Sequence, residues 1–392
     1  MKQVQEAYIV AATRTPIGRS HKGYFRNTRP DELLAHALRA ALAQVPGLDP
    51  AAIEDVICGC AIPEGAQGLN VARIGAVLAG LPKSVGGITV NRFCASGLSA
   101  LQMAADRIRV GEADVMIAAG TESMSMVPMM GNSPSLSPTI FSDPDDIESY
   151  GIAYGMGLTA EKVAQQWKVS REAQDEFAYQ SHMKAIAAMK AGEFANEITP
   201  VEVADRSVDL DSAEVTIARR SVNIDEGARP DTTPEGLAKL RTVFSARGSV
   251  TAGNSSQTSD GAGALILASE AAVKRFGLKP LARFVSYASK GVPPHIMGIG
   301  PIEAIPAALK YAGLKHQDMD WIELNEAFAA QSLAVMNTLG RDPSKVNPMG
   351  GAIALGHPLG ATGAIRSATV VHALQRKNLK YGMVTMCVGM GQ

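Results

Sequence analysis

The 392-residue sequence has few cysteines and almost no net charge. Its four cysteines, Cys58, Cys60, Cys94 and Cys387, are too sparse for a fold held together by disulfides. Cys58 and Cys60 lie two positions apart with no second Cys or His pair beside them, so no metal site is predicted. The formal net charge of −1 gives no sign of the chain-wide field expected of a protein that binds nucleic acid or acidic membranes.

Long apolar runs are also missing. No stretch approaches the roughly 20 apolar residues that span a bilayer, so no membrane span is expected. The first residues, MKQVQE, pass directly into the strand-like segment 8–12 without the basic head and apolar stretch of a signal peptide. The last residues are not a peroxisomal tripeptide. These absences make the cytoplasm the expected location.

The composition is that of a globular α/β protein. Hydrophobic residues make up 46% and charged residues 19%, and a chain of this length predicts two or three domains. Strands and amphipathic helices alternate near both ends of the chain, which indicates α/β architecture. Strands are predicted at 8–12, 54–58, 115–119, 282–286 and 320–325, and helices at 33–42 and 302–311.

Two stretches of the chain share one pattern. Residues 33–57 and 302–322 each read as a helix, a Gly-Leu pair, a spacer and an Asp-led strand. This favours an internal duplication into two α/β halves, with chance similarity of ordinary β-α-β segments as the alternative. The amino-acid composition changes between the two halves. Methionines and prolines at 124–138 predict a loop, and helices are predicted at 159–168 and 170–191. Such insertions usually carry substrate contacts.

A cysteine lies at a predicted strand-to-helix turn. An extended run ends in the small-residue stretch NRFCASG (residues 91–97), and apolar residues then follow at helical spacing. This pattern places Cys94 at the N-terminus of a helix, where free amides and the helix dipole lower the pKa of a thiol and favour a nucleophile. A buried cysteine in a turn is the alternative.

Three more strand exits carry polar or sulfur side chains. His357 stands among five glycines in residues 347–364, a pattern that permits close backbone approach and matches no nucleotide-binding fingerprint. It is either a general base or a structural histidine. Cys387 follows the strand-like segment 382–385 between glycines. Asn325 ends a predicted strand, where its amide is placed to hold a water or donate to an oxygen.

These four stretches together resemble the signature blocks of the thiolases. The matching blocks are NRFCASG around Cys94, NEAF beginning at Asn325, GGAIALGHPLG around His357 and CVGMG beginning at Cys387. The Gly-His-Pro block is highly specific to that family. The resemblance runs from residue 14 to the last residue, so it covers nearly the whole chain.

The resemblance implies a five-layered αβαβα thiolase fold of two similar halves, each with a mixed five-stranded sheet. The implied parts are residues 1–121 plus 249–270 for the N-terminal half, 122–248 for an inserted loop domain, and 271–392 for the C-terminal half. Segment 251–268 would return to the N-terminal half as its last strand. Family members continue into a further C-terminal strand, so a shorter sheet edge is expected unless residues follow Gln392.

The resemblance also implies an enzyme, an acetyl-CoA C-acyltransferase that cleaves 3-ketoacyl-CoA with coenzyme A. His357 would take the proton of Cys94, whose thiolate attacks the 3-keto carbonyl, and the amides of Cys94 and Gly389 would form the oxyanion hole. A water on Asn325, together with His357, would stabilise the acetyl-CoA enolate, and Cys387 would protonate it. Coenzyme A is then a co-substrate, and no permanently bound cofactor is expected.

The resemblance also implies which residues bind coenzyme A and the acyl chain. Arg229 would lie by the nucleotide, Ser256 would contact coenzyme A, and Met156 and Phe328 would line the acyl and pantetheine pocket. A solvated surface charge is the alternative for Arg229, and ordinary core is the alternative for Met156 and Phe328. The expected partners are acyl-CoA and coenzyme A. The expected assembly is a homodimer or homotetramer, and the alternative is that the chain is one subunit of a β-oxidation complex.

Three blocks favour the degradative, fatty-acid β-oxidation type over biosynthetic acetoacetyl-CoA thiolases, which condense two acetyl-CoA molecules. They are RPDTT (229–233), NSSQTSD (254–260) and CVGMGQ (387–392). Other classes fit less well. A Cys-His-Asn hydrolase would leave Cys387 unexplained, and a ketoacyl synthase would need a Cys-His-His set. A non-catalytic lipid-binding relative is disfavoured because Cys94, His357 and Cys387 are all present.

Overall fold

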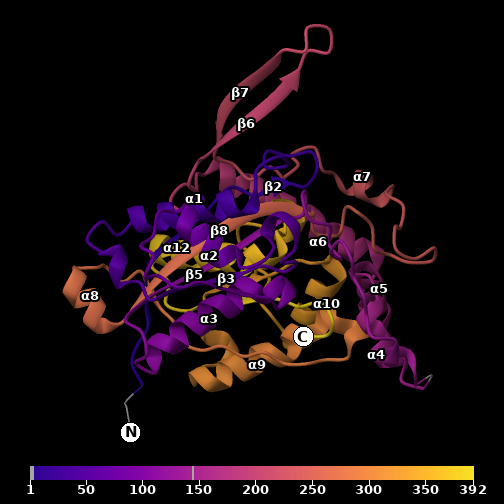
Figure 1. The fold of residues 1–392 in the computed structure, drawn as a ribbon. Helices are drawn as coiled ribbons and strands as arrows, with labels where there is room; N and C mark the ends of the chain where they lie inside the picture. Colours follow the sequence, from indigo (N-terminus) through magenta and orange to yellow (C-terminus); the bar gives the residue numbers. More distant parts are fainter. Residues whose placement is uncertain (1–3, 144) are drawn as a thin grey trace.

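The computed structural model describes residues 4–143 and 145–392 and contains one large sheet, one small sheet and a projecting hairpin (Figure 1). The large sheet has the order β4-β3-β5-β8-β1-β9, and β2 also pairs with β8. β3 is parallel to β4 and β5, and the pairs that involve β8 are antiparallel. The strands of this sheet are β1 (Tyr8–Arg14), β2 (Gly18–Arg19), β3 (Asp55–Gly59), β4 (Ile88–Val90), β5 (Val115–Ser123), β8 (Ser259–Ala268) and β9 (Ala282–Arg283).

Both faces of the large sheet are covered by helices. Every residue of β5 and β8 is buried, as their continuous apolar runs predict. Alternate side chains point to opposite faces: Ile117 packs toward α1 (Pro30–Ala43) and α2 (Val71–Leu78), whereas Met116 packs toward α3 (Ser96–Arg109) and α12 (Thr362–Lys377). β8 pairs with β1 and β5, so residues 259–268 lie in the same sheet as strands from the first 123 residues.

The small sheet adds two more layers. It consists of β10 (Trp321–Leu324) and β11 (Gly382–Thr385), which are parallel. One face packs on α12, and the other packs on α9 (Gly300–Ala312) and α10 (Ala329–Leu339). The order is therefore helices, large sheet, helices α3 and α12, small sheet, helices, which confirms the five-layered thiolase fold. The two stretches that share a sequence pattern, 33–57 and 302–322, occupy equivalent places. In one outer layer α1 precedes β3, and in the other α9 precedes β10.

The small sheet departs from the expected five strands. In the described residues it has two strands, and Ile322 adds a single bridge to Val346. The strand predicted at 282–286 is reduced to β9, which pairs with β1 of the large sheet. Segment 284–293 therefore belongs to neither sheet, because a strand needs a partner and an apolar pattern alone does not supply one.

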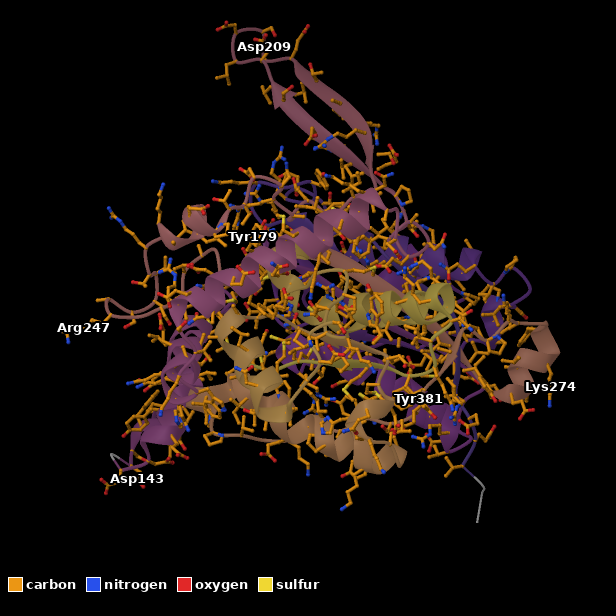
Figure 2. The ribbon with its side chains drawn as sticks, turned by 180° about the vertical axis from the view of Figure 1, so that it is seen from behind. Asp143, Tyr179, Asp209, Arg247, Lys274 and Tyr381 are labelled. Atoms are coloured by element: carbon orange, nitrogen blue, oxygen red, sulfur yellow. The ribbon has the colours of Figure 1, made fainter. Side chains whose placement is uncertain are left out.

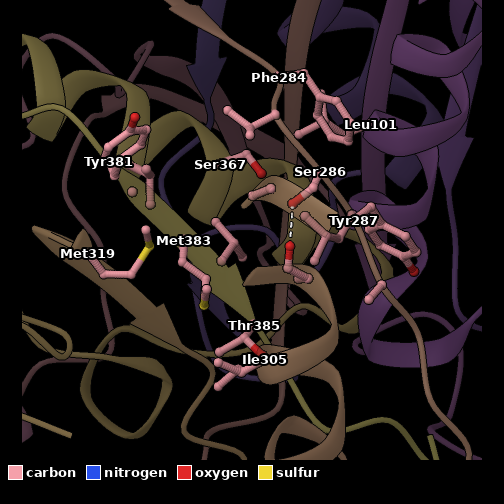
Figure 3. Close-up of a pocket in the computed structure, with 18 of the residues that line it drawn as sticks. Leu101, Phe284, Ser286, Tyr287, Ile305, Met319, Ser367, Tyr381, Met383 and Thr385 are labelled. Atoms are coloured by element: carbon pink, nitrogen blue, oxygen red, sulfur yellow. Dashed lines mark hydrogen bonds between the residues drawn. The ribbon is translucent and has the colours of Figure 1, made fainter. Parts of the chain in front are cut away.

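A cavity of about 450 Å³ lies beside β11 (Figure 3). All four residues of β11 line it, opposite the unpaired segment 284–290, and α9 and α12 complete its walls. Ser286 donates a hydrogen bond of 2.9 Å to the carbonyl of Ala308 across one wall. Of the described residues that line this cavity, none is Cys94, Asn325, His357 or Cys387. The lining does include Ala95, Met386 and Val388, which are chain neighbours of Cys94 and Cys387.

The region between the halves combines loops, helices and the hairpin. Residues 124–137 form the predicted loop, in which Met124 is buried and Met130 is exposed. The predicted helices are α5 (Met156–Gln166) and α6 (Arg171–Lys190), and Ser170 caps α6 by accepting from the Ala173 amide at 3.2 Å. The other elements of this region are α4 (Ile147–Tyr150), β6 (Val201–Val208), β7 (Val215–Val222) and α7 (Pro234–Ala238).

The remaining helices are short or lie at the edge of the fold. α8 (Glu270–Phe276) follows β8, and α11 (Ala352–Leu355) begins just after the glycine pair 350–351. Within residues 4–143 and 145–392, no helix has the length and apolar character that a membrane crossing requires.

Candidate active site

Cys94 lies in a tight turn between β4 and α3. The turn is the 3-10 helix Phe93–Ala95, and Phe93 has a left-handed φ of 42°, which a non-glycine residue keeps only when its surroundings hold it there. The Ser96 hydroxyl does this, since it accepts from the Arg92 amide at 2.9 Å and donates to the Phe93 carbonyl at 2.7 Å. Cys94 is thereby fixed at the N-terminal end of α3, as the sequence predicts.

His357 lies in the loop between α11 and α12, and both of its ring nitrogens have partners. Its Nδ1 is 2.6 Å from the Thr362 hydroxyl, and its Nε2 is 3.3 Å from Nδ2 of Asn325. Its backbone amide donates to the Gln257 carbonyl and to the Ser259 hydroxyl, both at 3.1 Å. The ring is buried, with 4% of the residue exposed, so its orientation is set by these contacts.

Asn325 and Cys387 follow the two strands of the small sheet. Parallel strands end at the same edge, and the Asn325 amide donates to the carbonyl of Thr385 at 2.9 Å, so the two exits are adjacent. Cys387 is fully buried. Oδ1 of Asn325 is buried and has no hydrogen-bond partner among the described residues. An unpaired buried acceptor of this kind is costly, and a water or ligand at the site would satisfy it.

The turns of Cys94 and His357 meet at two glycines. A Cβ on Gly97 would lie 2.8 Å from the Ala364 nitrogen, and a Cβ on Gly363 would overlap the Leu98 nitrogen. Only glycine allows the first turns of α3 and α12 to approach so closely. As a result Cys94 packs in one cluster with Leu359, two residues beyond His357.

The amide of Gly389, from the loop after β11, also acts on the Cys94 sulfur. It lowers the pKa of the thiol, as does the amide of Cys94 itself, which places both predicted oxyanion donors next to the sulfur. Cys387 is close enough to Cys94 for a charge on one sulfur to raise the pKa of the other. Cys94, Cys387 and Gly389 therefore share one site, to which the hydrogen-bonded pair of His357 and Asn325 belongs through the contacts above.

The predicted lowering of the Cys94 pKa is wrong in its net direction. Burial raises the pKa of Cys94 to about 11, and the lowering by the two amides is smaller. Burial also raises the pKa of Cys387. His357 shows the opposite shift, because burial, with a smaller contribution from the Arg366 charge, lowers its pKa to about 3. At neutral pH the resting site therefore holds two thiols and a neutral imidazole.

Three of the four predicted substrate contacts gather at this site. Met156 packs in one cluster with Phe328 and Cys387, and its sulfur would lie 3.4 Å from a Cβ at position 389. The Ser256 amide donates to the Ala327 carbonyl at 2.9 Å, which places Ser256 beside Phe328. Met156 and Phe328 therefore pack against Cys387, and Ser256 lies beside them.

Arg229 lies apart from the buried cluster. Its side chain is exposed and makes no ion pair with any described residue, while its backbone amide donates to Nδ1 of His182 at 3.2 Å. The nearby Gly227 carbonyl accepts from the Gln257 side chain at 2.9 Å, and Gln257 also bonds to the carbonyls of Ile353 and Ala354. Gln257 thus ties the Arg229 loop to the His357 loop.

Sequence reasoning missed Glu122. This buried carboxylate accepts from the amides of Ala61 and Gly360, each at 2.7 Å, and from the side chain of Gln67. It therefore joins the loop after β3 to the loop that carries His357. A carboxylate near the end of the fully buried strand β5 was the available signal, because such a group requires buried partners. Thr362 and Gln257 were missed as well and left no comparable signal.

Within residues 4–143 and 145–392, no cluster of three or more His, Cys, Asp or Glu side chains is arranged to hold a metal ion.

Comparison with known proteins identifies the family. Residues 7–271 match the family described as "Thiolase, N-terminal domain", and residues 278–392 match "Thiolase, C-terminal domain". The chain is 48% identical to a 3-ketoacyl-CoA thiolase of Bacillus subtilis over 99% of its own length and 97% of that protein.

Two solved structures extend the comparison. The human mitochondrial 3-ketoacyl-CoA thiolase in complex with CoA superimposes with a TM-score of 0.86 at 38% identity, covering 100% of this chain and 97% of that one. A Bacillus anthracis acetyl-CoA acetyltransferase gives a TM-score of 0.88 at 37% identity, covering 100% and 98%. The chain belongs to the thiolase family of enzymes and is similar to 3-ketoacyl-CoA thiolases within it.

Proposed function

We propose that the protein is an acetyl-CoA C-acyltransferase that cleaves 3-ketoacyl-CoA with coenzyme A, in the degradative direction of fatty-acid β-oxidation. The observation that carries the carbon–carbon bond chemistry is a second buried sulfur, Cys387, within electrostatic reach of Cys94. The similarity to 3-ketoacyl-CoA thiolases supports the degradative direction. A hydrolase needs one nucleophile and a base. Carbon–carbon cleavage next to a thioester also needs a proton donor for the carbanion that leaves, and a thiol whose pKa is raised by burial stays protonated for that step.

The first half-reaction begins at the thiol of Cys94. Nε2 of His357 takes its proton as the sulfur attacks the 3-keto carbonyl, and the oxyanion forms against the amides of Cys94 and Gly389. The C2–C3 bond then breaks, and its electron pair becomes the enolate of acetyl-CoA. A water on the unpaired Oδ1 of Asn325, together with the protonated His357, stabilises the enolate oxygen. Cys387 gives its proton to C2, and acetyl-CoA leaves.

The second half-reaction restores both sulfurs. The thiol of coenzyme A gives its proton to the Cys387 thiolate and attacks the thioester on Cys94. His357 returns its proton to the departing Cys94 sulfur, so the enzyme ends in its starting protonation state. Because the Cys94 thioester is similar in energy to an acyl-CoA thioester, the acyl-enzyme does not accumulate as a trap. Two substrates reacting through a covalent intermediate give ping-pong kinetics.

Substrate binding follows the placement of the remaining residues. Met156 and Phe328 line the acyl and pantetheine channel, Ser256 contacts the pantetheine arm, and Arg229 meets the nucleotide end. The exposed, unpaired guanidinium of Arg229 suits a phosphate contact. Coenzyme A is a co-substrate, and no permanently bound cofactor is part of the mechanism.

The remaining organisation is proposed with the activity. Residues 1–121 and 249–270 form the N-terminal half, 122–248 the loop domain, and 271–392 the C-terminal half. The pairing of β8 with β1 and β5 supports grouping the two segments of the first half. We further propose that the protein is cytoplasmic and forms a homodimer or homotetramer. Light scattering would measure the molar mass and so the number of chains in the assembly.

The test compares coenzyme A-dependent cleavage of acetoacetyl-CoA with that of a longer 3-ketoacyl-CoA. We expect faster cleavage of the longer substrate, strict dependence on coenzyme A, and loss of both activities in Cys94→Ala. Cleavage that survives Cys94→Ala, or that needs no coenzyme A, would contradict the mechanism.

A biosynthetic acetoacetyl-CoA thiolase is the second candidate, favoured by the similarity to the Bacillus anthracis acetyl-CoA acetyltransferase. It uses the same groups in reverse to condense two acetyl-CoA molecules. Cleavage of acetoacetyl-CoA alone, with no turnover of the longer substrate, would select it.

A further inference from the structure

A hydroxyl group lies directly behind the imidazole of His357. Thr362 is the first residue of α12, and 1% of it is exposed. Its Oγ1 is 2.6 Å from Nδ1 of His357 and 3.0 Å from the carbonyl oxygen of Pro358. Both distances are those of hydrogen bonds, but a hydroxyl has only one proton to donate.

The position of Pro358 decides where that proton goes. Its carbonyl lies four residues before Thr362, the separation at which threonine side chains donate back to the helix backbone. A hydroxyl that donates to Pro358 must accept from Nδ1, so Nδ1 of His357 carries the ring proton. The other ring nitrogen leads to the same tautomer. Nδ2 of Asn325 is a hydrogen-bond donor 3.3 Å from Nε2, so Nε2 must be the acceptor. Nε2 therefore carries a lone pair that accepts from the Asn325 amide.

We propose that Thr362 is a positioning residue that holds His357 as its Nδ1–H tautomer, so that Nε2 carries the lone pair. This inference rests on the proposed function only for its consequence, since Nε2 is the nitrogen that takes the Cys94 proton there. In free histidine the tautomer with the proton on Nε2 predominates. The ring therefore needs a partner at Nδ1 to keep the reactive nitrogen unprotonated.

The arrangement also accounts for the way the base works later in the cycle. Once Nε2 has taken a proton, both ring nitrogens are donors. The Nδ1 proton still has its acceptor in Thr362, so the new proton on Nε2 remains directed at the reacting centre. A ring fixed at Nδ1 thus receives and returns a proton without turning.

The alternative tautomer, with the proton on Nε2, would require a different set of hydrogen bonds. The Thr362 hydroxyl would donate to Nδ1, and Nε2–H would donate to Oδ1 of an Asn325 amide turned by half a revolution. The Pro358 carbonyl would still accept from the amides of Ala361 and Thr362, at 2.9 and 3.0 Å. The two arrangements differ in which nitrogen of His357 carries the proton, and this can be measured.

The first experiment reads the tautomer directly. Long-range proton–nitrogen correlation spectra are recorded at neutral pH on the whole protein labelled with nitrogen-15 histidine, with His357 assigned by its absence from His357→Asn. We expect a protonated-type shift at Nδ1 and an unprotonated-type shift at Nε2. The reverse pattern would overturn the proposal. The spectrum does not depend on turnover, so a protein without thiolase activity but with this pattern would refute the function and leave the tautomer in place.

The second experiment tests the role of Thr362 with a matched pair of variants. Thr362→Val keeps the shape but removes the acceptor, whereas Thr362→Ser keeps the hydroxyl. We expect the valine variant to move His357 toward the Nε2–H tautomer and to slow acylation of Cys94 roughly 10–100-fold with little change in KM. The serine variant should stay within about twofold of the parent in both measurements.

Two results of this pair would refute the assignment. One is an unchanged tautomer in Thr362→Val. The other is a serine variant as slow as the valine variant, because a purely packing role would be disturbed by both.

Discussion

At Cys94, burial and hydrogen bonding act in opposite directions. The amides of Gly389 and Cys94 favour the thiolate, but burial outweighs them and leaves the pKa at about 11. Roughly one thiol in ten thousand would then be ionised at pH 7. The thiolate must therefore be made during the reaction by a base. His357, the base we propose, stays neutral down to about pH 3.

This balance predicts an unusual pH dependence for modification of Cys94. A raised pKa means that the thiol form persists as pH rises, so alkylation by iodoacetamide should accelerate about tenfold per pH unit from 7 to 10 without levelling off. The unfolded chain should level off near its ordinary thiol pKa, about 8.5. Cys94→Ser provides the background rate. A plateau near pH 8 in the folded protein would show that the amides outweigh burial.

His357 sets the acid side of the activity profile. Its pKa is lowered to about 3, so acidification does not protonate the base until far below neutrality. We expect kcat/KM for 3-ketoacyl-CoA to show no loss from imidazole protonation between pH 7 and about pH 5. A fall centred near pH 6.5 would mean that the ring titrates as an exposed histidine does.

Cys387 can be separated from Cys94 by choosing the reaction. Exchange of an acyl group between acyl-CoA and free coenzyme A uses Cys94 and breaks no carbon–carbon bond, so no carbanion needs a proton. In Cys387→Ala we expect cleavage of 3-ketoacyl-CoA to fall roughly 10²–10⁴-fold. Acyl exchange should fall much less, about 10-fold, because Cys387 only takes the proton of the coenzyme A thiol there, and solvent can also take the proton of a thiol with an ordinary pKa. Both reactions are followed on the same preparation. Equal losses in the two reactions would show that Cys387 is not the proton donor to the carbanion and acts only in acyl transfer or in packing.

The side chains proposed to react are easier to identify from the sequence than the residues that support them. Cys94, His357 and Cys387 each lie in a glycine-flanked turn, and such turns are visible in a few consecutive letters. Glu122 supports the His357 loop from 238 positions away in the chain, by accepting from Gly360. Nor does a local pattern report burial, which is why the pKa of Cys94 was predicted in the wrong direction.

Among the elements, the contact between the first turns of α3 and α12 brings together the turns of Cys94 and His357, the proposed nucleophile and base. Each helix contributes one glycine to the contact, Gly97 and Gly363, and neither position has room for a methyl group. The sequence showed both glycines but not that they face each other, since this depends on how the two halves pack.

The glycine contact can be tested with alanine. Gly363→Ala places a methyl group against the Leu98 backbone, which must move, so we expect a loss of about 1–3 kcal/mol in the free energy of unfolding and a fall in kcat. At Gly291 a Cβ meets no atom nearer than 4.0 Å, and Gly291→Ala is the matched control. Denaturant titration and acyl exchange measure the two effects. A stable, fully active Gly363→Ala would show that the contact is looser than described.

The small sheet shows where pattern reading fails at the scale of elements. Residues 282–286 have the composition of a strand, yet only β9 is paired, and its partner is in the large sheet. β11 pairs with β10 along one edge, and its residues line the cavity. Composition identified a chain segment able to form a strand, but a strand also needs a neighbour that the segment itself cannot specify.

Over the whole molecule, the catalytic turns lie inside the layered body and the β6–β7 hairpin lies outside it. The hairpin projects from the body, with Asp209 at its tip (Figures 1 and 2). Val208, Val215 and Ile217 near the tip are about half exposed. Its side-chain contacts with the body include an ion pair of 3.2 Å between Arg26 and Asp205, both partly exposed.

This separation predicts that the body folds and works without the hairpin. Ala204 and Arg219 are directly opposed in the two strands, so an Asn-Gly turn in place of residues 205–218 closes the hairpin between them. The lost ion pairs are exposed and contribute less than about 1 kcal/mol, so the thermal midpoint should change by only a few degrees at most. Acyl exchange per chain should stay within about twofold.

The control keeps the hairpin and changes only its surface. Threonine at positions 208, 215 and 217 preserves strand propensity while removing the exposed apolar groups. If the shortened protein lost stability or activity and the threonine variant did too, those apolar side chains would be in contact with another part of the assembled protein. Loss in the shortened variant alone would instead show that the base of the hairpin braces the body, contrary to the independence argued here. Unchanged behaviour in both, by calorimetry and acyl exchange, would establish that the layered body alone holds the site.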